Sequence, residues 1–315
     1  MLSLVIPVYK NEANLPDLLA AIEGLNTSVG TAFEAVFVID GSPDRCYEIL
    51  RERLPQCGFA SQLVLLSRNF GSFAAIRAGL HAGQGRHFAV MAADLQEPPE
   101  LVLQMAAALQ ADEADVVLGV RNARSDPALS RWSADLFWTL YRRYVVHEVP
   151  PGGVDIFACN KAFRDELLTL QESHSSLIAQ VFWLGYRRKF IEYGRRERQH
   201  GTSAWTWKKK RNYMMDSVFA FTDLPIRLLI RTGGLVAVLS GLFALAVIVS
   251  RLMGSIAVPG YAITVLAIVF FGALNLFALG VVGSYAWRAY ENTKARPLHV
   301  VLRSHAWPLI HPETP

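Results

Sequence analysis

Residues 91–100 read MAADLQEPPE, and this stretch decides the fold. An apolar run at residues 87–90 comes directly before it, and a helical pattern at residues 101–109 follows it. Asp94 and Gln96 therefore stand at the tip of a buried strand. In open α/β sheets ligands bind beyond the carboxyl ends of the strands. Carboxylate and amide oxygens suit Mg²⁺ or Mn²⁺, so the stretch predicts a site for a diphosphate held by a divalent cation.

The same alternation of strand and helix runs through the first half of the chain. The expected strands are residues 2–8, 35–39, 63–66, 87–91, 116–119 and 154–158, and the expected helices are residues 15–25, 44–54, 72–82 and 99–109. Strands that alternate with helices predict a parallel sheet covered on both faces. The predicted fold class is therefore α/β, with a Rossmann-like, mostly parallel sheet.

Hydrophobic residues make up 52% of the 315 residues, and the mean hydropathy is +0.25. The excess lies in two uncharged runs, residues 233–250 and 258–287. Each run is long enough to cross a hydrocarbon core of about 30 Å as a helix. We therefore expect a hairpin of two transmembrane helices at about residues 232–253 and 259–287. The alternative is a pair of buried helices in a large soluble core.

Basic residues lie next to both runs on the side that carries the two chain ends. They are Lys208, Lys209, Lys210, Arg211, Arg227 and Arg231 before the first run, and Arg288, Lys294, Arg296 and Arg303 after the second. The positive-inside rule then predicts a multi-pass protein of the cytoplasmic membrane with both termini in the cytoplasm. The predicted domains are residues 1–206 in the cytoplasm, an interfacial amphipathic helix at 207–231, the hairpin at 232–287 and a cytoplasmic tail at 288–315. For residues 207–231, an ordinary helix packed on the first domain is the alternative.

Charge and cysteine content argue against a nucleic-acid partner, a disulfide framework and a zinc site. The net charge is +4, and the basic residues cluster beside the predicted lipid, so nucleic acid is not an expected partner. The three cysteines, Cys46, Cys57 and Cys159, form no CxxC pair, which argues against a disulfide framework and against a zinc site.

Polar residues end three expected strands, as PVYKNE at 7–12, DGSPD at 40–44 and DLQEPP at 94–99. In this order they resemble the family 2 glycosyltransferases with a GT-A nucleotide-sugar fold. More narrowly, they resemble the polyprenyl-phosphate glycosyltransferases similar to dolichyl-phosphate mannose synthase and its bacterial glucosyl relatives. RQHGTSAW at 198–205 is similar to the family's Arg-x-x-Gly-x-Ser loop, and the resemblance extends to the membrane hairpin.

The resemblance implies inverting transfer of one hexose from a nucleotide diphosphate sugar, a UDP-sugar being favoured, to a polyprenyl (undecaprenyl) phosphate. The transfer would take place at the cytoplasmic face of the membrane and serve cell-envelope glycan or glycolipid modification. It implies a sugar-donor pocket at Pro7, Tyr9, Glu12, Asp40 and Ser42, a Mg²⁺ or Mn²⁺ site at Asp94 and Gln96, and catalytic roles for Asp94, Asp155 and Arg198.

The acceptor of such a reaction is already anionic, because the second pKa of a phosphate monoester is about 6. It therefore needs cationic positioning more than a strong base. The expected contacts to phosphate or acceptor are Arg121, Arg124, Arg131, Arg196 and Ser203. A solvated surface role is the alternative for each arginine. Residues 200–203 are expected to form a flap over the sugar donor.

The chain departs from the family pattern at three positions. Ala92 replaces the first Asp of a DxD motif, Ile39 replaces the first residue of an acidic pair, and Phe157 stands where relatives have an arginine. The dependence on a cation is therefore open.

Several alternatives also stay open. Asp40 and Asp44 can be turn formers or a helix N-cap, and Asp155 can be a carboxylate bonded to backbone. A processive polysaccharide synthase is disfavoured because the chain has no QxxRW motif. A non-catalytic, membrane-anchored nucleotide-binding partner, a transferase acting on another lipid or glycan acceptor, and a homo-oligomer remain alternatives.

Overall fold

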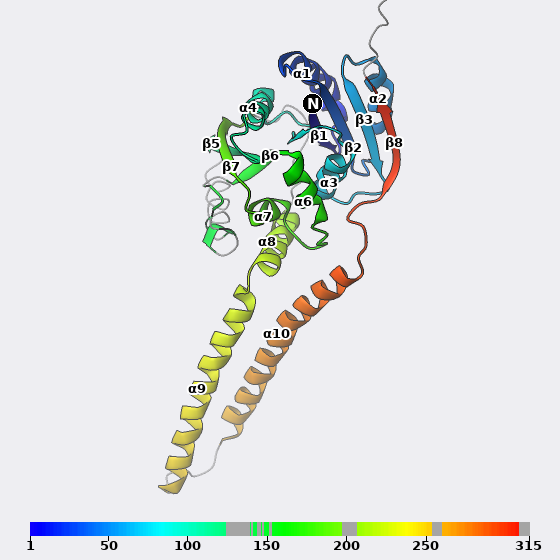
Figure 1. Ribbon diagram of the computed structural model, residues 1–315. Helices are drawn as coiled ribbons and strands as arrows, with labels where there is room; N and C mark the ends of the chain where they lie inside the picture. Colours follow the sequence, from blue (N-terminus) through cyan, green and yellow to red (C-terminus); the bar gives the residue numbers. More distant parts are fainter. Residues whose placement is uncertain are drawn as a thin grey trace, which may run out of the picture.

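The computed structural model describes residues 1–123, 139, 141–143, 146, 148–150, 153–196, 207–253 and 260–308. An α/β domain stands at one end of two long helices that project away from it (Figure 1). The predicted positions Arg124, Arg131, Arg198 and Ser203, and the flap at 200–203, lie outside the described residues.

One mixed sheet forms the centre of the domain. Its strands are β1 (Leu2–Val8), β2 (Phe33–Ile39), β3 (Ala60–Leu66), β4 (His87–Val90), β5 (Val116–Ala123), β6 (Val154–Asn160), β7 (Arg188–Gly194) and β8 (Val301–Trp307), in the order β7-β5-β6-β4-β1-β2-β3-β8. The pairs β1–β2, β1–β4, β2–β3 and β5–β7 are parallel, whereas β6 runs antiparallel to β4 and β5, and β8 antiparallel to β3. The predicted α/β class with a mostly parallel sheet is confirmed.

Helices follow the strands where the sequence places their start signals. They are α1 (Leu15–Ser28), α2 (Cys46–Arg53), α3 (Ser72–Ala82), α4 (Pro99–Gln110), α6 (Lys161–Thr169), α7 (Leu177–Trp183), α8 (Trp207–Phe221), α9 (Leu224–Leu252) and α10 (Tyr261–Thr293). A proline in the first turn begins α1 and α4, where a missing N–H costs nothing. Asn160 and Ser176 cap α6 and α7 by accepting from the backbone N–H groups of Phe163 and Ala179.

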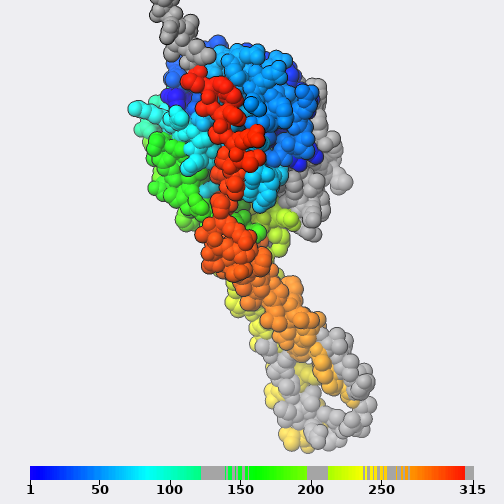
Figure 2. Space-filling model, turned by 90° about the vertical axis from the view of Figure 1, so that its right-hand side faces the viewer, coloured from blue at the N-terminus to red at the C-terminus, as the bar shows by residue number. Residues whose placement is uncertain are grey.

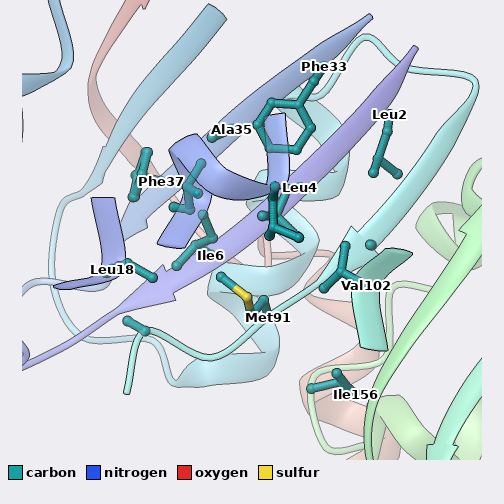
Figure 3. Close-up of a cluster of buried hydrophobic side chains, with 14 of the residues drawn as sticks. Leu2, Leu4, Ile6, Leu18, Phe33, Ala35, Phe37, Met91, Val102 and Ile156 are labelled. Atoms are coloured by element: carbon teal, nitrogen blue, oxygen red, sulfur yellow. The ribbon is translucent and has the colours of Figure 1, made fainter. Parts of the chain in front are cut away.

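Alternating side chains of the strands build one core on each face of the sheet. Leu4, Ile6 and Phe37 pack with residues of α1 and α4 in the first core (Figure 3). Val5 and Val38 point the other way, into a core that includes α3. Helix α3 can lie directly on the sheet because Gly79 has no side chain. A Cβ at this position would come within 2.3 Å of Val5 Cγ1. The central strands are therefore buried on both faces.

After the long helices the chain returns to the domain, which the sequence did not predict. Strand β8 lies within the predicted tail and forms the edge of the sheet next to β3, above α10 (Figure 2). The backbone N–H of Ser67 donates to the carbonyl of Val300 at 2.9 Å, and Tyr47 Oη lies 2.9 Å from His305 Nε2. Residues before and after the long helices therefore belong to one sheet.

The membrane region differs in detail from the sequence prediction. The expected single helix at 207–231 is divided, since α8 ends at Phe221 and α9 begins at Leu224. Within the part of the chain that the structure describes, one segment, Phe270–Thr293 of α10, is long and apolar enough to cross a membrane, with a mean hydropathy of 1.4. The two-helix hairpin stays a prediction.

Candidate active site

The polar motifs of the sequence meet at one edge of the sheet, which we call the carboxyl edge. Strands β1, β2, β4, β5 and β7 end there, and the antiparallel strand β6 begins there. The carboxyl edge therefore gathers the loops at residues 9–12, 40–45, 94–98 and 195–196 beside the start of β6. Loops at such an edge carry ligand sites in open α/β folds.

The loops after β1 and β2 are joined by reciprocal hydrogen bonds. The backbone N–H of Lys10 donates to Ser42 Oγ at 2.8 Å, and that of Glu12 donates to Asp44 Oδ2 at 3.2 Å. In return, the N–H of Arg45 donates to Glu12 Oε2 at 3.0 Å. Glu12 and Ser42, both expected in the sugar-donor pocket, thus hold two neighbouring loops in one arrangement.

Asp44 is the centre of this joint. Burial by itself raises the pKa of Asp44, but hydrogen bonds from Ser42, from Cys46 and from the backbone of Glu12 outweigh it, so the pKa lies below its usual value. Ser42 Oγ donates to Asp44 Oδ1 at 2.6 Å. Asp44 therefore acts as the turn-forming carboxylate that the sequence left as one alternative.

Asp40 is only 2% exposed and binds the backbone of the loop before α3. Its carboxylate accepts from the N–H of Phe70 at 2.7 Å and from that of Gly71 at 2.9 Å. Gly41 follows with φ +56°, and a Cβ there would lie 2.3 Å from the carbonyl carbon of Arg68. The described contacts of Asp40 are those of a turn former, and its expected contact with a base or ribose stays a prediction.

The Asp94 turn has a backbone conformation that few side chains adopt. Leu95 has φ +54°, and the N–H of Gln96 donates to Asp94 Oδ1 at 3.3 Å. Leucine rarely takes a left-handed conformation, so the turn is held by its surroundings. Backbone strain of this kind is typical of turns that hold functional side chains in a fixed position.

Two arginines after β7 lie on this turn. Arg195 Nη2 donates to Gln96 Oε1, and the backbone N–H of Arg196 donates to the Gln96 carbonyl at 2.9 Å. The Arg196 guanidinium pairs with the exposed carboxylate of Glu100 at 3.2 Å. Arg196 was expected near phosphate, whereas Arg195 was not singled out. The guanidinium of Arg195 and the backbone of Arg196 therefore contact the Asp94 turn.

The remaining predicted residues also map to the carboxyl edge. Pro7 is in β1 one residue before its end, and Tyr9 follows β1 with Lys10 Nζ 5.5 Å from its ring centre. Arg121 is near the end of β5, opposite Tyr193 of β7. Asp155 is the second residue of β6, and its side chain lies outside the described residues.

Comparison with known proteins gives the family. The model of glycosyl transferase family 2 matches residues 3–170, which include the loops after β1, β2 and β4. The chain is a family 2 glycosyltransferase. The predicted resemblance is confirmed, and the sheet described above is the GT-A-like domain of this enzyme.

Named relatives of the glycosyltransferase span nearly all of its length. An uncharacterized glycosyltransferase of Synechocystis is 32% identical over 98% of this chain and 96% of its own length. The undecaprenyl-phosphate 4-deoxy-4-formamido-L-arabinose transferase of Pseudomonas paraeruginosa is 35% identical over 96% of this chain and 90% of its own. Among solved structures, the mannosyltransferase PcManGT from Pyrobaculum calidifontis, in complex with GDP-Man and Mn²⁺, has a TM-score of 0.49 at 14% identity, covering 91% of this chain and 87% of that one.

The family implies a divalent cation, and the two predicted ligands fit it unequally. Asp94 offers a carboxylate at the strand tip, and Mg²⁺ commonly uses one or two carboxylates together with substrate phosphates and water. The Gln96 oxygen, by contrast, accepts from the Arg195 guanidinium, whose positive charge opposes a cation at the same atom. Among the described residues, no group of three His, Cys, Asp or Glu side chains could hold a metal ion. A cation at the glycosyltransferase site would therefore rest mainly on Asp94 and on the sugar donor.

Proposed function

We propose that this glycosyltransferase moves a single hexose from a nucleotide diphosphate sugar, a UDP-sugar being favoured, to a polyprenyl phosphate at the cytoplasmic face of a membrane. The relatives named as undecaprenyl-phosphate transferases support the class of acceptor, since they match 96% of this chain. The observation that carries the proposal is the meeting of the Asp94 turn with Arg195 and Arg196 at the carboxyl edge.

The position of the carboxyl edge suits a lipid acceptor. Val301 of β8 pairs with Leu66, the last residue of β3, so the chain enters the sheet from α10 at this edge. Residues 294–300 separate the end of α10 from β8. Seven residues span at most about 25 Å. The base of the long apolar helix is thus within reach of the edge at which the phosphate chemistry is proposed.

The residues at this edge have separate tasks in the transfer. An oxygen of the acceptor phosphate attacks the anomeric carbon, the bond from that carbon to the diphosphate breaks, and the nucleoside diphosphate leaves with the electron pair. The attacking face lies opposite the leaving group, so the sugar inverts. Arg195 and Arg121 lie where they can stabilise negative charge on phosphate oxygens. A cation bound at Asp94 would supply further stabilisation of the leaving diphosphate.

The sheet topology supports a membrane hairpin. Strands β1 to β7 precede α9, and β8 follows α10, yet all eight strands belong to one sheet. A chain that leaves a domain and returns to it must cross a membrane an even number of times. If α10 crosses, α9 must cross as well. The basic residues Arg227, Arg231 and Arg288 flank the domain side of both helices, which favours a cytoplasmic domain.

Transfer of a labelled sugar into lipid tests the proposal. The full chain, purified in neutral detergent, is incubated with undecaprenyl phosphate and each of a panel of UDP- and GDP-sugars, with Mg²⁺, Mn²⁺ or EDTA. We expect label to enter the organic phase with one sugar donor, and Asp94→Ala to reduce it to background. Transfer to a different acceptor, or tight nucleotide binding without transfer to polyprenyl phosphate, would contradict the proposed acceptor.

A further inference from the structure

A cleft of about 560 Å³ opens between α8, α10 and the loop before α7. Its lining includes His174, Asp216, Gly280, Gly283, Trp287 and Arg288. None of these residues belongs to the strand-end loops of the carboxyl edge. The cleft is therefore separate from the loops at which the sugar donor is proposed to bind.

The lining of the cleft marks its depth relative to a bilayer. Arg288 is the first charged residue after the uncharged run at 258–287, and Trp287 beside it is 56% exposed. Tryptophan and arginine gather at the level of lipid headgroups. The cleft thus lies at headgroup depth when α10 spans the membrane. This step rests on the proposed placement of α10 and not on sugar transfer.

Arg288 has hydrogen-bonding capacity that the described residues do not use. Its Nη2 donates to Asp216 Oδ1 at 2.9 Å, and its guanidinium carbon lies 5.0 Å from the ring centre of Phe219. Its Nη1 is buried and has no hydrogen-bond partner among the described residues. A guanidinium carries five N–H donors in a planar fork. The side chain is 19% exposed and lines the cleft, so the donors that Asp216 does not occupy can bind a second oxyanion beside Asp216.

We propose that this cleft binds the phosphodiester headgroup of an anionic bilayer phospholipid, with Arg288 as the phosphate ligand. A volume of about 560 Å³ is that of a small-molecule pocket. Gly280 and Gly283 leave room along α10 for the glycerol end of the lipid. Asp216 sets the preference among phosphates, because its carboxylate repels a monoester of nearly two charges more than a diester of one.

Binding of a short-chain lipid tests the inference without any sugar transfer. Dihexanoyl phosphatidylglycerol is titrated into the full chain in neutral detergent, and the dissociation constant is taken from the shift of the unfolding midpoint. Inorganic phosphate and farnesyl phosphate are titrated in parallel. We expect phosphatidylglycerol to bind more tightly than either. Equal binding of inorganic phosphate, or tighter binding of farnesyl phosphate, would overturn the assignment to a bilayer phospholipid.

Three variants locate the bound lipid. Arg288→Gln is expected to weaken binding about tenfold or more, the scale of a lost charged hydrogen bond. Arg227→Gln is the matched control, since Arg227 also pairs with an aspartate, Asp223, at the domain end of a long helix but does not line the cleft. Asp216→Asn should tighten binding, and it keeps the test decisive if Arg288→Gln does not fold. Equal loss in the two arginine variants, or weaker binding in Asp216→Asn, would overturn the proposal.

Discussion

The amino edge and the carboxyl edge of the sheet both carry carboxylates, and the two edges hold them by different contacts. At the amino edge, Arg187 pairs with Asp112 at 2.6 Å and with Asp115 at 3.0 Å, and Asn160 donates to the same Asp115 at 2.9 Å. Asp115 also accepts from the backbone N–H of Arg187 at 3.2 Å.

At the carboxyl edge, Glu12, Asp40 and Asp44 accept from backbone N–H groups of neighbouring loops, and none of these contacts is an ion pair. Ion pairs at the amino edge hold neighbouring strands together. Carboxylates at the carboxyl edge hold the turns in the arrangement that a ligand would meet.

We expect the largest effect to be on enzyme turnover, when the same substitution is made at each edge of the sheet. Asp94→Asn is expected to lower turnover by about a hundredfold or more, the scale for loss of a preorganised charge stabiliser. Asp115→Asn makes the same change at the amino edge and should leave turnover within about twofold. Labelled-sugar transfer by both purified variants measures this. Equal turnover of Asp94→Asn and the wild type would remove Asp94 from the site.

The second largest effect should be a loss of folding stability in variants of Asp40. Asp40→Ala removes the acceptor of the Phe70 and Gly71 N–H groups, and a buried donor left unsatisfied costs about 1–3 kcal/mol. Asp40→Asn keeps one carbonyl oxygen and should lose less. Urea unfolding in neutral detergent compares the two. An equal loss in both variants would show that the carboxylate does not hold this loop.

A smaller effect, on the KM for the sugar donor, should distinguish Arg195 from Arg196, the two arginines that contact the Asp94 turn. Arg195→Gln is expected to raise the KM for the sugar donor about tenfold, because the Gln96 side chain loses a charged partner. Arg196→Gln breaks a pair whose side chains are 55% and 64% exposed, and such pairs contribute little. Its KM should change about twofold. The reverse order would mean that Arg196 contacts substrate directly, as the sequence predicted.

The smallest effect should be an acid-dependent loss of stability at the amino edge. Hydrogen bonds from Arg187 hold the pKa of Asp115 below its usual 3.8. A carboxyl with a lowered folded-state pKa contributes stability above its unfolded pKa, and loses it as the pH falls through the folded value. The wild type should therefore lose stability below about pH 4 more steeply than Asp115→Asn. Parallel profiles from pH 2 to 7 would contradict this.

The sequence predicted the carboxyl edge well and the outer strands poorly. The central strands are buried on both faces, so they read as apolar runs before polar turns, as at residues 91–100. Strand β7, RKFIEYG, lies at the end of the sheet and mixes charged with apolar residues, which hides it. Strand β8 is joined to the domain through Tyr47 and His305, 258 residues apart, and no local signal predicts such a pairing.

The candidate site also could be predicted only where the pattern in the sequence is local. The Asp94 turn could be located because it follows a strand directly, which is a local pattern, and the role of Asp94 in the site stays a prediction. The contact of Arg195 with Gln96 joins residues 99 apart that follow β7 and β4, two strands that end at the same edge of the sheet with β5 and β6 between them. Asp40 and Asp44 could be placed at the site but not assigned a task, because a turn former and a ligand-binding residue look alike in sequence.

Hydrogen exchange with and without bound nucleotide tests the central claim most directly. The full chain in neutral detergent is compared alone and with UDP or GDP, whichever supports transfer. Nucleotide is predicted to slow exchange at residues 9–12, 40–45 and 94–98, and to leave the amino edge at residues 112–115 and 187 unchanged. Protection at the amino edge, or none at the carboxyl edge at saturating nucleotide, would contradict the account.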